Sequence, residues 1–162
     1  MMIIVMGVSG CGKTSVGMQL AKELNLPFFD ADDFHSKEHV EKMKNNQALT
    51  DEDRWPWLQG LSNNIKAWEQ SGGAVLACSA LKESYRQLLS ASEIPIFWVF
   101  LYGSFDLIQH RLEQRTHHYM SSTLLQSQMD TLEIPNYGLH LDVEASLASL
   151  VFEINSKLKI HG

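Results

Sequence analysis

The chain alternates between short apolar segments and longer segments in which apolar residues recur at helical spacing. The apolar segments predict strands over residues 2–6, 27–32, 74–78, 96–101 and 138–142. Helices are predicted over residues 13–24, 37–45, 104–115 and 144–159. Two further helices are expected between strands, one with Pro56 in its first turn and Gly72–Gly73 at its end, and one that contains Tyr85 and Leu89.

This alternation indicates an α/β fold of three layers, in which helices flank both faces of a parallel sheet of about five strands. A length of 162 residues, with 44% hydrophobic and 20% charged residues, fits a single domain over residues 1–162. In such sheets ligands bind beyond the carboxyl ends of the strands, so the polar residues that follow the strands are the candidate site.

Composition narrows the choice of partners and location. The formal net charge of -6 argues against nucleic acid as the main partner, because a phosphate backbone favours a basic face. No apolar run approaches the length of a membrane span, and residues 2–6 are too few for a signal peptide, so we expect no membrane association and a cytoplasmic protein. Cys11 and Cys78 are too few for a disulfide framework.

The segment "GVSGCGKT", residues 7–14, follows the first predicted strand directly and opens the first helix. It fits the phosphate-loop pattern G-x-x-x-x-G-K-[ST], whose glycines permit turns that aim backbone N–H groups at an anion. We expect Lys13 to reach the β- and γ-phosphates of ATP and the Thr14 hydroxyl to bind Mg²⁺. The loop residues expected to bind the nucleotide are Gly7, Val8, Ser9, Gly10, Cys11, Gly12, Lys13 and Thr14.

Cys11 lies inside this loop, just before a helix N-terminus. Backbone N–H dipoles and Lys13 would make its thiol reactive, so that a thiol reagent inactivates the protein and bound ATP with Mg²⁺ protects it. Alternatively, Cys11 is a small residue whose sulfur is turned away and inert. The sequence leaves both readings open.

Acidic residues follow the second predicted strand in "DADDFH", residues 30–35. Asp30 and Asp32 are two positions apart, so in an extended segment their side chains point the same way. We assign Asp30 to support of Mg²⁺ and Asp32 to acceptance of the proton of an attacking hydroxyl. Asp33 is more simply explained as a helix cap.

Cationic candidates follow the third strand and two of the helices. Lys82 and Arg86 are four positions apart and are predicted to share a helix face that an anionic substrate uses, with Ser79 nearby. Arg54 is a candidate clamp for a carboxylate, because guanidinium matches that group in a bidentate fork. Arg111 and Arg115 are predicted to close over the nucleotide within a mobile lid around residues 111–125.

Segments along nearly the whole chain resemble the small phosphate-loop gluconokinases, which are close in fold to shikimate kinase and the nucleoside monophosphate kinases. The most distinctive matches are "DEDRWPWL" at residues 51–58 and "CSALK" at residues 78–82, since the phosphate loop alone fits many families. The resemblance implies a phosphate-loop kinase that transfers the γ-phosphate of ATP to the 6-hydroxyl of D-gluconate. It also implies Mg²⁺ and, commonly, a homodimer.

On this reading Lys13, Asp32 and Arg115 are the catalytic residues. The residues expected to contact gluconate are Asp32, His35, Arg54, Ser79, Lys82 and Arg86. A related kinase acting on another sugar acid, shikimate or a nucleoside monophosphate is the main alternative. A nucleotide-dependent switch without phosphate transfer is the other, although it would need no second polar pocket.

Overall fold

The computed structural model describes residues 1–90, 93–115 and 121–161. Five parallel strands form one sheet in the order β2-β3-β1-β4-β5. The strands are β1 (Met2–Met6), β2 (Phe28–Asp30), β3 (Ala74–Ala77), β4 (Ile96–Tyr102) and β5 (Leu139–Asp142). The α/β class with a five-stranded parallel sheet, predicted from the alternation of patterns, is confirmed.

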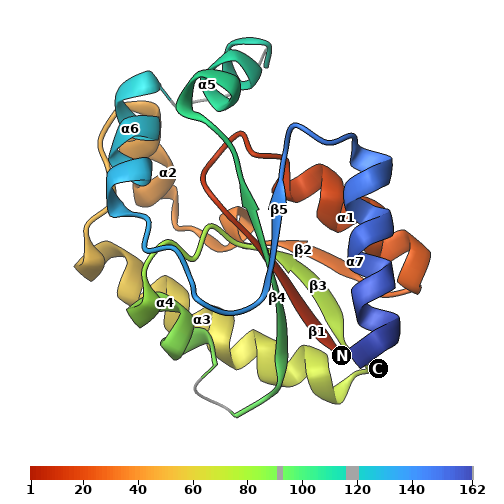
Figure 1. The fold of residues 1–162 in the computed structure, drawn as a ribbon. Helices are drawn as coiled ribbons and strands as arrows, with labels where there is room; N and C mark the ends of the chain where they lie inside the picture. Colours follow the sequence, from red (N-terminus) through yellow and green to blue (C-terminus); the bar gives the residue numbers. More distant parts are fainter. Residues whose placement is uncertain (91–92, 116–120, 162) are drawn as a thin grey trace.

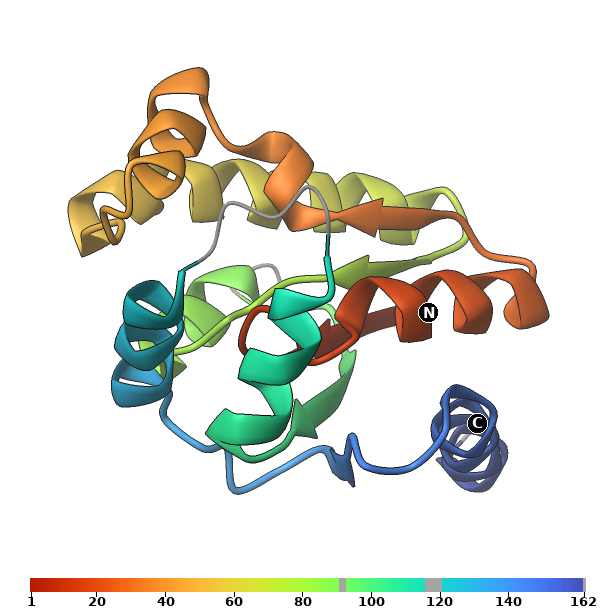
Figure 2. The ribbon, with the colours of Figure 1, turned by 90° about the horizontal axis from the view of Figure 1, so that it is seen from above.

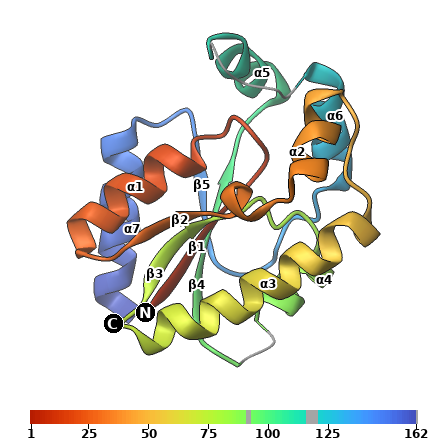
Figure 3. The same ribbon diagram turned by 180° about the vertical axis from the view of Figure 1, so that it is seen from behind.

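Helices flank both faces of this sheet. They are α1 (Lys13–Leu24), α2 (Lys37–Lys44), α3 (Asp51–Gln70), α4 (Glu83–Leu89), α5 (Phe105–Glu113), α6 (Ser122–Thr131) and α7 (Leu147–His161), with a 3₁₀ helix η1 (Ala31–Phe34). Figure 1 and Figure 3 show α1 and α7 on one face and α3 and α4 on the other. Among the described helices, none has the length and apolar content required to cross a membrane.

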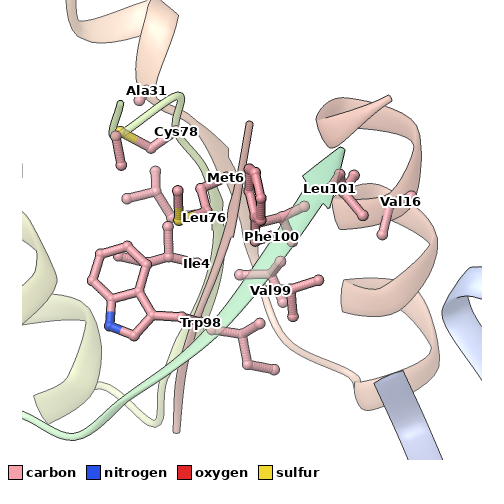
Figure 4. Packing of buried hydrophobic residues seen from close by; sticks show 14 of the residues in the cluster. Ile4, Met6, Val16, Ala31, Leu76, Cys78, Trp98, Val99, Phe100 and Leu101 are labelled. Carbon is pink, nitrogen blue, oxygen red and sulfur yellow. The ribbon is translucent and has the colours of Figure 1, made fainter. Parts of the chain in front are cut away.

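The core lies between the sheet and these two helical layers. All five residues of β1 are buried because β1 is the central strand and is covered on both faces. Figure 4 shows Val16 of α1 beside Leu101 on one face, and Trp98 next to its register partner Ile4 on the other. Burial on both faces explains why the central strands are continuously apolar in sequence.

Two predicted elements differ in detail from the structure. The helix expected to begin near Pro56 begins at Asp51, because Thr50 and Asp53 form a capping box at its N-terminus, so Pro56 lies inside α3. The second strand ends at Asp30, whose carboxylate accepts a hydrogen bond from the Asp32 N–H and turns the chain into η1. The extended segment expected to align Asp30 with Asp32 is therefore wrong.

Candidate active site

A cleft of about 580 Å³ opens at the carboxyl ends of the strands, the edge seen from above in Figure 2. Its walls come from the phosphate loop, η1, α3, the end of β3, the end of α5 and α6. The structure thus brings together side chains that are more than 100 positions apart in sequence, such as Lys13 and Gln128. The predicted site residues that line this cleft are Ser9, Gly10, Gly12, Lys13, Thr14, Asp30, Asp32, His35, Arg54, Ser79 and Arg115.

The phosphate loop depends on glycine for close approach as well as for backbone conformation. Gly7 has φ 146°, and a Cβ there would lie 2.5 Å from the Leu101 carbonyl oxygen. Gly12 caps α1 in the left-handed conformation, and among the described residues no side chain caps the first turn of the helix. Unbonded N–H groups at a helix N-terminus that opens into a cleft form a site for an anion such as a phosphate group.

Lys13 is the first residue of α1, and its side chain folds back over the phosphate loop. Its Nζ donates hydrogen bonds of 2.8 Å to the Gly7 carbonyl oxygen and 2.9 Å to the Val8 carbonyl oxygen. Within the described part of the chain, no carboxylate forms an ion pair with Lys13. Its positive charge is therefore available to phosphate oxygens in the cleft.

The Thr14 hydroxyl and the Asp30 carboxylate lie together beside this loop. Thr14 Oγ1 donates to Asp30 Oδ2 over 2.9 Å, and Asp30 Oδ1 accepts from the Asp32 N–H over 3.0 Å. A hydroxyl and a carboxylate next to a phosphate site fit Mg²⁺, which takes one or two protein oxygens together with phosphate oxygens and water. The described residues contain no group of three or more His, Cys, Asp or Glu side chains arranged to hold a metal by themselves.

Asp32 differs from Asp30 in its hydrogen bonding. No described donor bonds the Asp32 carboxylate, and the His35 ring lies near it, with Nε2 3.7 Å from Asp32 Oδ1. Loss of hydration in the cleft wall raises the pKa of Asp32, nearby Asp30 and Asp33 raise it further, and Lys13 lowers it. A carboxylate with a raised pKa and unoccupied lone pairs is suited to accept a proton.

His35 is held between η1 and α3. Its ring stacks on Trp57 with centroids 4.0 Å apart, and Trp57 Nε1 donates to the Ala31 carbonyl oxygen over 2.9 Å. Burial lowers the pKa of His35 to about 4, with further lowering from His39 and Arg54. The ring is therefore neutral near pH 7 and can exchange hydrogen bonds with hydroxyl groups in the cleft.

Two arginines add positive charge to the cleft. Arg54 projects from α3, and its Nη1 donates to the Tyr85 hydroxyl over 3.1 Å. Arg115 follows α5, is exposed, and lines the cleft together with Leu112 and Gln114. Neither arginine forms an ion pair with a described carboxylate, so both charges can act on an anionic ligand.

The predicted cationic face of Lys82 and Arg86 is wrong. Lys82 is the N-cap of α4 and pairs with Asp51, whereas Arg86 is only 1% exposed. The Arg86 donors bond the carbonyl oxygens of Ala80, Leu81 and Glu133, the Glu83 carboxylate and the Tyr137 hydroxyl. Arg86 thus holds the turn after β3, where Ala80 adopts the left-handed φ of 45°, and it is not a substrate contact.

The predicted lid lies only partly within the described residues. Residues 116–120 are outside them, Arg111 lies near the end of α5, and residues 122–125 begin α6. Arg111 Nη2 donates to the Val143 carbonyl oxygen over 2.6 Å and is not part of the cleft lining. Closure of this segment over a nucleotide, with Arg111 and Arg115, stays a prediction.

Both cysteines are buried. Cys11 is 1% exposed, and its sulfur packs beneath the loop, where a Cβ on Gly7 would lie 2.8 Å from it. Val8 is buried as well. Because neither side chain is exposed, Val8 and Cys11 can contact a ligand only through their backbone atoms. Burial raises the pKa of the Cys78 thiol to about 12. The structure favours the inert alternative for Cys11.

Sequence reasoning missed both glutamines of the cleft, Gln114 and Gln128. Gln128 of α6 accepts a hydrogen bond of 2.8 Å from the Ser9 N–H and donates to Ser9 Oγ over 3.3 Å. Trp57 packs in the core and also lines the cleft. No local signal marks Gln128, because α6 was not predicted as a helix and its contact spans 119 positions.

Comparison with known proteins places this site in a family. A family model described as shikimate kinase matches residues 9–145. The probable gluconokinase of Xenopus tropicalis is 42% identical, over 98% of this chain and 93% of its own. The chain belongs to the gluconokinases within the shikimate kinase family.

Solved structures agree with this membership. A gluconokinase from Sinorhizobium meliloti 1021 superposes with a TM-score of 0.83 at 37% identity, over 99% of this chain and 96% of that one. A sugar kinase from Janibacter sp. HTCC2649 superposes with a TM-score of 0.91 at 39% identity, over 98% of this chain and 94% of that one. The phosphate-loop kinase fold expected of the gluconokinases is confirmed, and kinases of this family use ATP.

Proposed function

We propose that this protein transfers the γ-phosphate of ATP to the 6-hydroxyl of D-gluconate. The observation that carries the proposal is one cleft that holds a phosphate loop, the Asp32 carboxylate and the Arg54 guanidinium. A phosphate site alone fits any nucleotide-binding protein, whereas an added proton acceptor and an added anion clamp fit transfer to a hydroxy acid. Gluconokinase relatives over nearly the full chain support gluconate as that acid.

In this proposal the phosphate chain of ATP lies on the loop amides, with Lys13 on its β- and γ-phosphates. Thr14 and Asp30 would hold Mg²⁺, which when bound offsets negative charge on the phosphates. The 6-hydroxyl oxygen forms a bond to the γ-phosphorus as the bond between that phosphorus and the β–γ bridging oxygen breaks. Asp32 takes the hydroxyl proton, and the products are 6-phosphogluconate and ADP.

The other end of gluconate lies toward α3. Arg54 binds the carboxylate, while His35 and Ser79 exchange hydrogen bonds with hydroxyl groups of the chain. Arg115 extends positive charge over the transferring phosphate. The cytoplasmic location and the homodimer expected from the sequence stay predictions.

The test is ADP release by the purified protein with MgATP and each of several acceptors: D-gluconate, other sugar acids, shikimate and AMP. Gluconate is expected to give the highest kcat/KM, with 6-phosphogluconate identified by NMR. Lys13→Ala, prepared in parallel, controls for contaminating kinases because it removes the charge expected on the transferring phosphate. Highest kcat/KM with shikimate or AMP would overturn the assignment to gluconate.

A further inference from the structure

Tyr85 stands between two opposite charges beside the cleft. It lies on α4, next to α3 (Figure 1, Figure 3), and only 2% of it is exposed. Its hydroxyl accepts a hydrogen bond from Arg54 Nη1 over 3.1 Å and donates one to Asp51 Oδ1. These directions are fixed, because a guanidinium only donates and a carboxylate only accepts.

Asp51 and Arg54 have the sequence spacing of an ion pair on a helix. They are three positions apart in the first turns of α3, a spacing that places side chains on one helix face. Instead, Asp51 is held by Tyr85 and by Lys82, whose Nζ lies 3.1 Å from both carboxylate oxygens. Among the described residues no carboxylate forms an ion pair with Arg54, which lines the cleft while Asp51 does not.

The bonds at Asp51 agree with this arrangement. The Tyr85 hydrogen bond and then the Lys82 hydrogen bond hold the pKa of Asp51 below its ordinary value, so Asp51 stays charged near pH 7. A permanently charged carboxylate on the same helix face would compete with a substrate carboxylate for Arg54. A neutral hydroxyl bonded to Nη1 fixes the guanidinium without neutralising it.

We propose that Tyr85 is a positioning residue that keeps Arg54 from pairing with Asp51 and so holds its charge for the acceptor's carboxylate. The proposal rests on the proposed function, in which Arg54 binds that carboxylate. The proposal extends that function by explaining how Arg54, although close in sequence to the charged Asp51, stays available to the acceptor. Without the Tyr85 hydroxyl, Arg54 turns toward Asp51 and leaves the cleft.

The experiment compares four proteins by steady-state kinetics with gluconate and ATP varied in turn: wild type, Tyr85→Phe, the double variant Tyr85→Phe/Asp51→Asn, and Tyr137→Phe. Tyr137 is the matched control, because its hydroxyl also accepts from an arginine, Arg86, and donates to a carboxylate, Glu83. Unlike Arg54, Arg86 does not line the cleft.

Tyr85→Phe is expected to raise the KM for gluconate about tenfold, the size expected for a hydrogen bond to a charged group, and to leave the KM for ATP within about twofold. Adding Asp51→Asn is expected to restore most of the gluconate KM, because the competing charge is gone. Tyr137→Phe is expected to leave both KM values unchanged. A purely structural role for Tyr85 would not be reversed by Asp51→Asn.

An unchanged gluconate KM in Tyr85→Phe, an equal rise in both KM values, or no recovery in the double variant would overturn the proposal. Circular dichroism checks folding. If Tyr85→Phe is unfolded, Asp51→Asn alone, which keeps the buried Tyr85 ring, gives a second decision. It is expected to leave the gluconate KM within about twofold of wild type, and a tenfold rise would overturn the proposal. If wild type phosphorylates a different acid, the proposed function is wrong. The same variants measured with that acid then decide the role of Tyr85 separately.

Discussion

The Thr14 hydroxyl donates a hydrogen bond of 2.9 Å to Asp30 Oδ2 and thereby joins the phosphate loop to the end of β2. Thr14 and Asp30 are 16 positions apart in sequence, so only the folded chain brings their oxygens together. Each is a ligand type that Mg²⁺ prefers, and both line the cleft. The pair is therefore the place where the proposed Mg²⁺ would bind.

We expect Asp30→Asn to raise the Mg²⁺ concentration needed for half-maximal activity by about tenfold or more, because an amide oxygen is a weaker ligand than a carboxylate. The measurement is a Mg²⁺ titration of ADP release at fixed ATP. Asp33→Asn is the control, since Asp33 is exposed and is not part of the cleft lining. Equal Mg²⁺ requirements in wild type and Asp30→Asn would remove Asp30 from the metal site.

Asp32→Asn is expected to lower kcat about 100-fold or more and to change the ATP affinity little, because the amide keeps the shape but cannot accept the hydroxyl proton. Wild-type kcat should fall as the pH is lowered through the pKa of Asp32, which lies above its ordinary value of 3.8. Rapid-quench or coupled assays across pH measure both effects. Loss of ATP binding with normal residual turnover would make Asp30 the better candidate for the base.

The sequence was most informative where function depends on local backbone. The phosphate loop was predicted residue by residue because its glycines and Lys13 act within one turn between a strand and a helix. Arg86 was misassigned because helical spacing shows which residues share a face but not whether that face is buried. The bonds that reveal its role come from residues as far away as Glu133 and Tyr137. Asp30 and Asp32 were misaligned because a side-chain hydrogen bond ended the strand early.

His35 is expected to make stability depend on pH. The folded protein protonates His35 only near pH 4, whereas an unfolded chain does so near 6.5, so the unfolded state binds more protons between these values. Its stabilising contribution is complete above pH 6.5 and is lost as the pH falls toward 4, by at most about 3 kcal/mol. Urea unfolding at several pH values measures this slope. His35→Gln should flatten the slope, whereas His140→Gln at an exposed position should not.

Arg86→Met is expected to lower the free energy of unfolding by about 3 kcal/mol, because it leaves the carbonyl oxygens of Ala80 and Glu133 without their Arg86 donor and removes the ion pair with Glu83. Urea unfolding at constant pH measures the change. Arg115→Met, at an exposed position, is the control and should shift stability by no more than about 0.5 kcal/mol. A stable Arg86→Met protein with a raised KM for gluconate would restore Arg86 as a substrate contact.

Cys11 is expected to resist thiol reagents in the folded protein. Its sulfur is buried beneath the phosphate loop against Gly7, so a reagent reaches it only when the loop opens. Cys78 is equally buried, and its pKa of about 12 leaves almost no thiolate at pH 8.

Counting labelled thiols with a coloured disulfide reagent should therefore give two groups in urea and close to none under native conditions. Cys11→Ser and Cys78→Ser variants assign any labelling that is seen. Fast native labelling that disappears in Cys11→Ser, and that ATP with Mg²⁺ slows, would instead establish a reactive thiol in the loop.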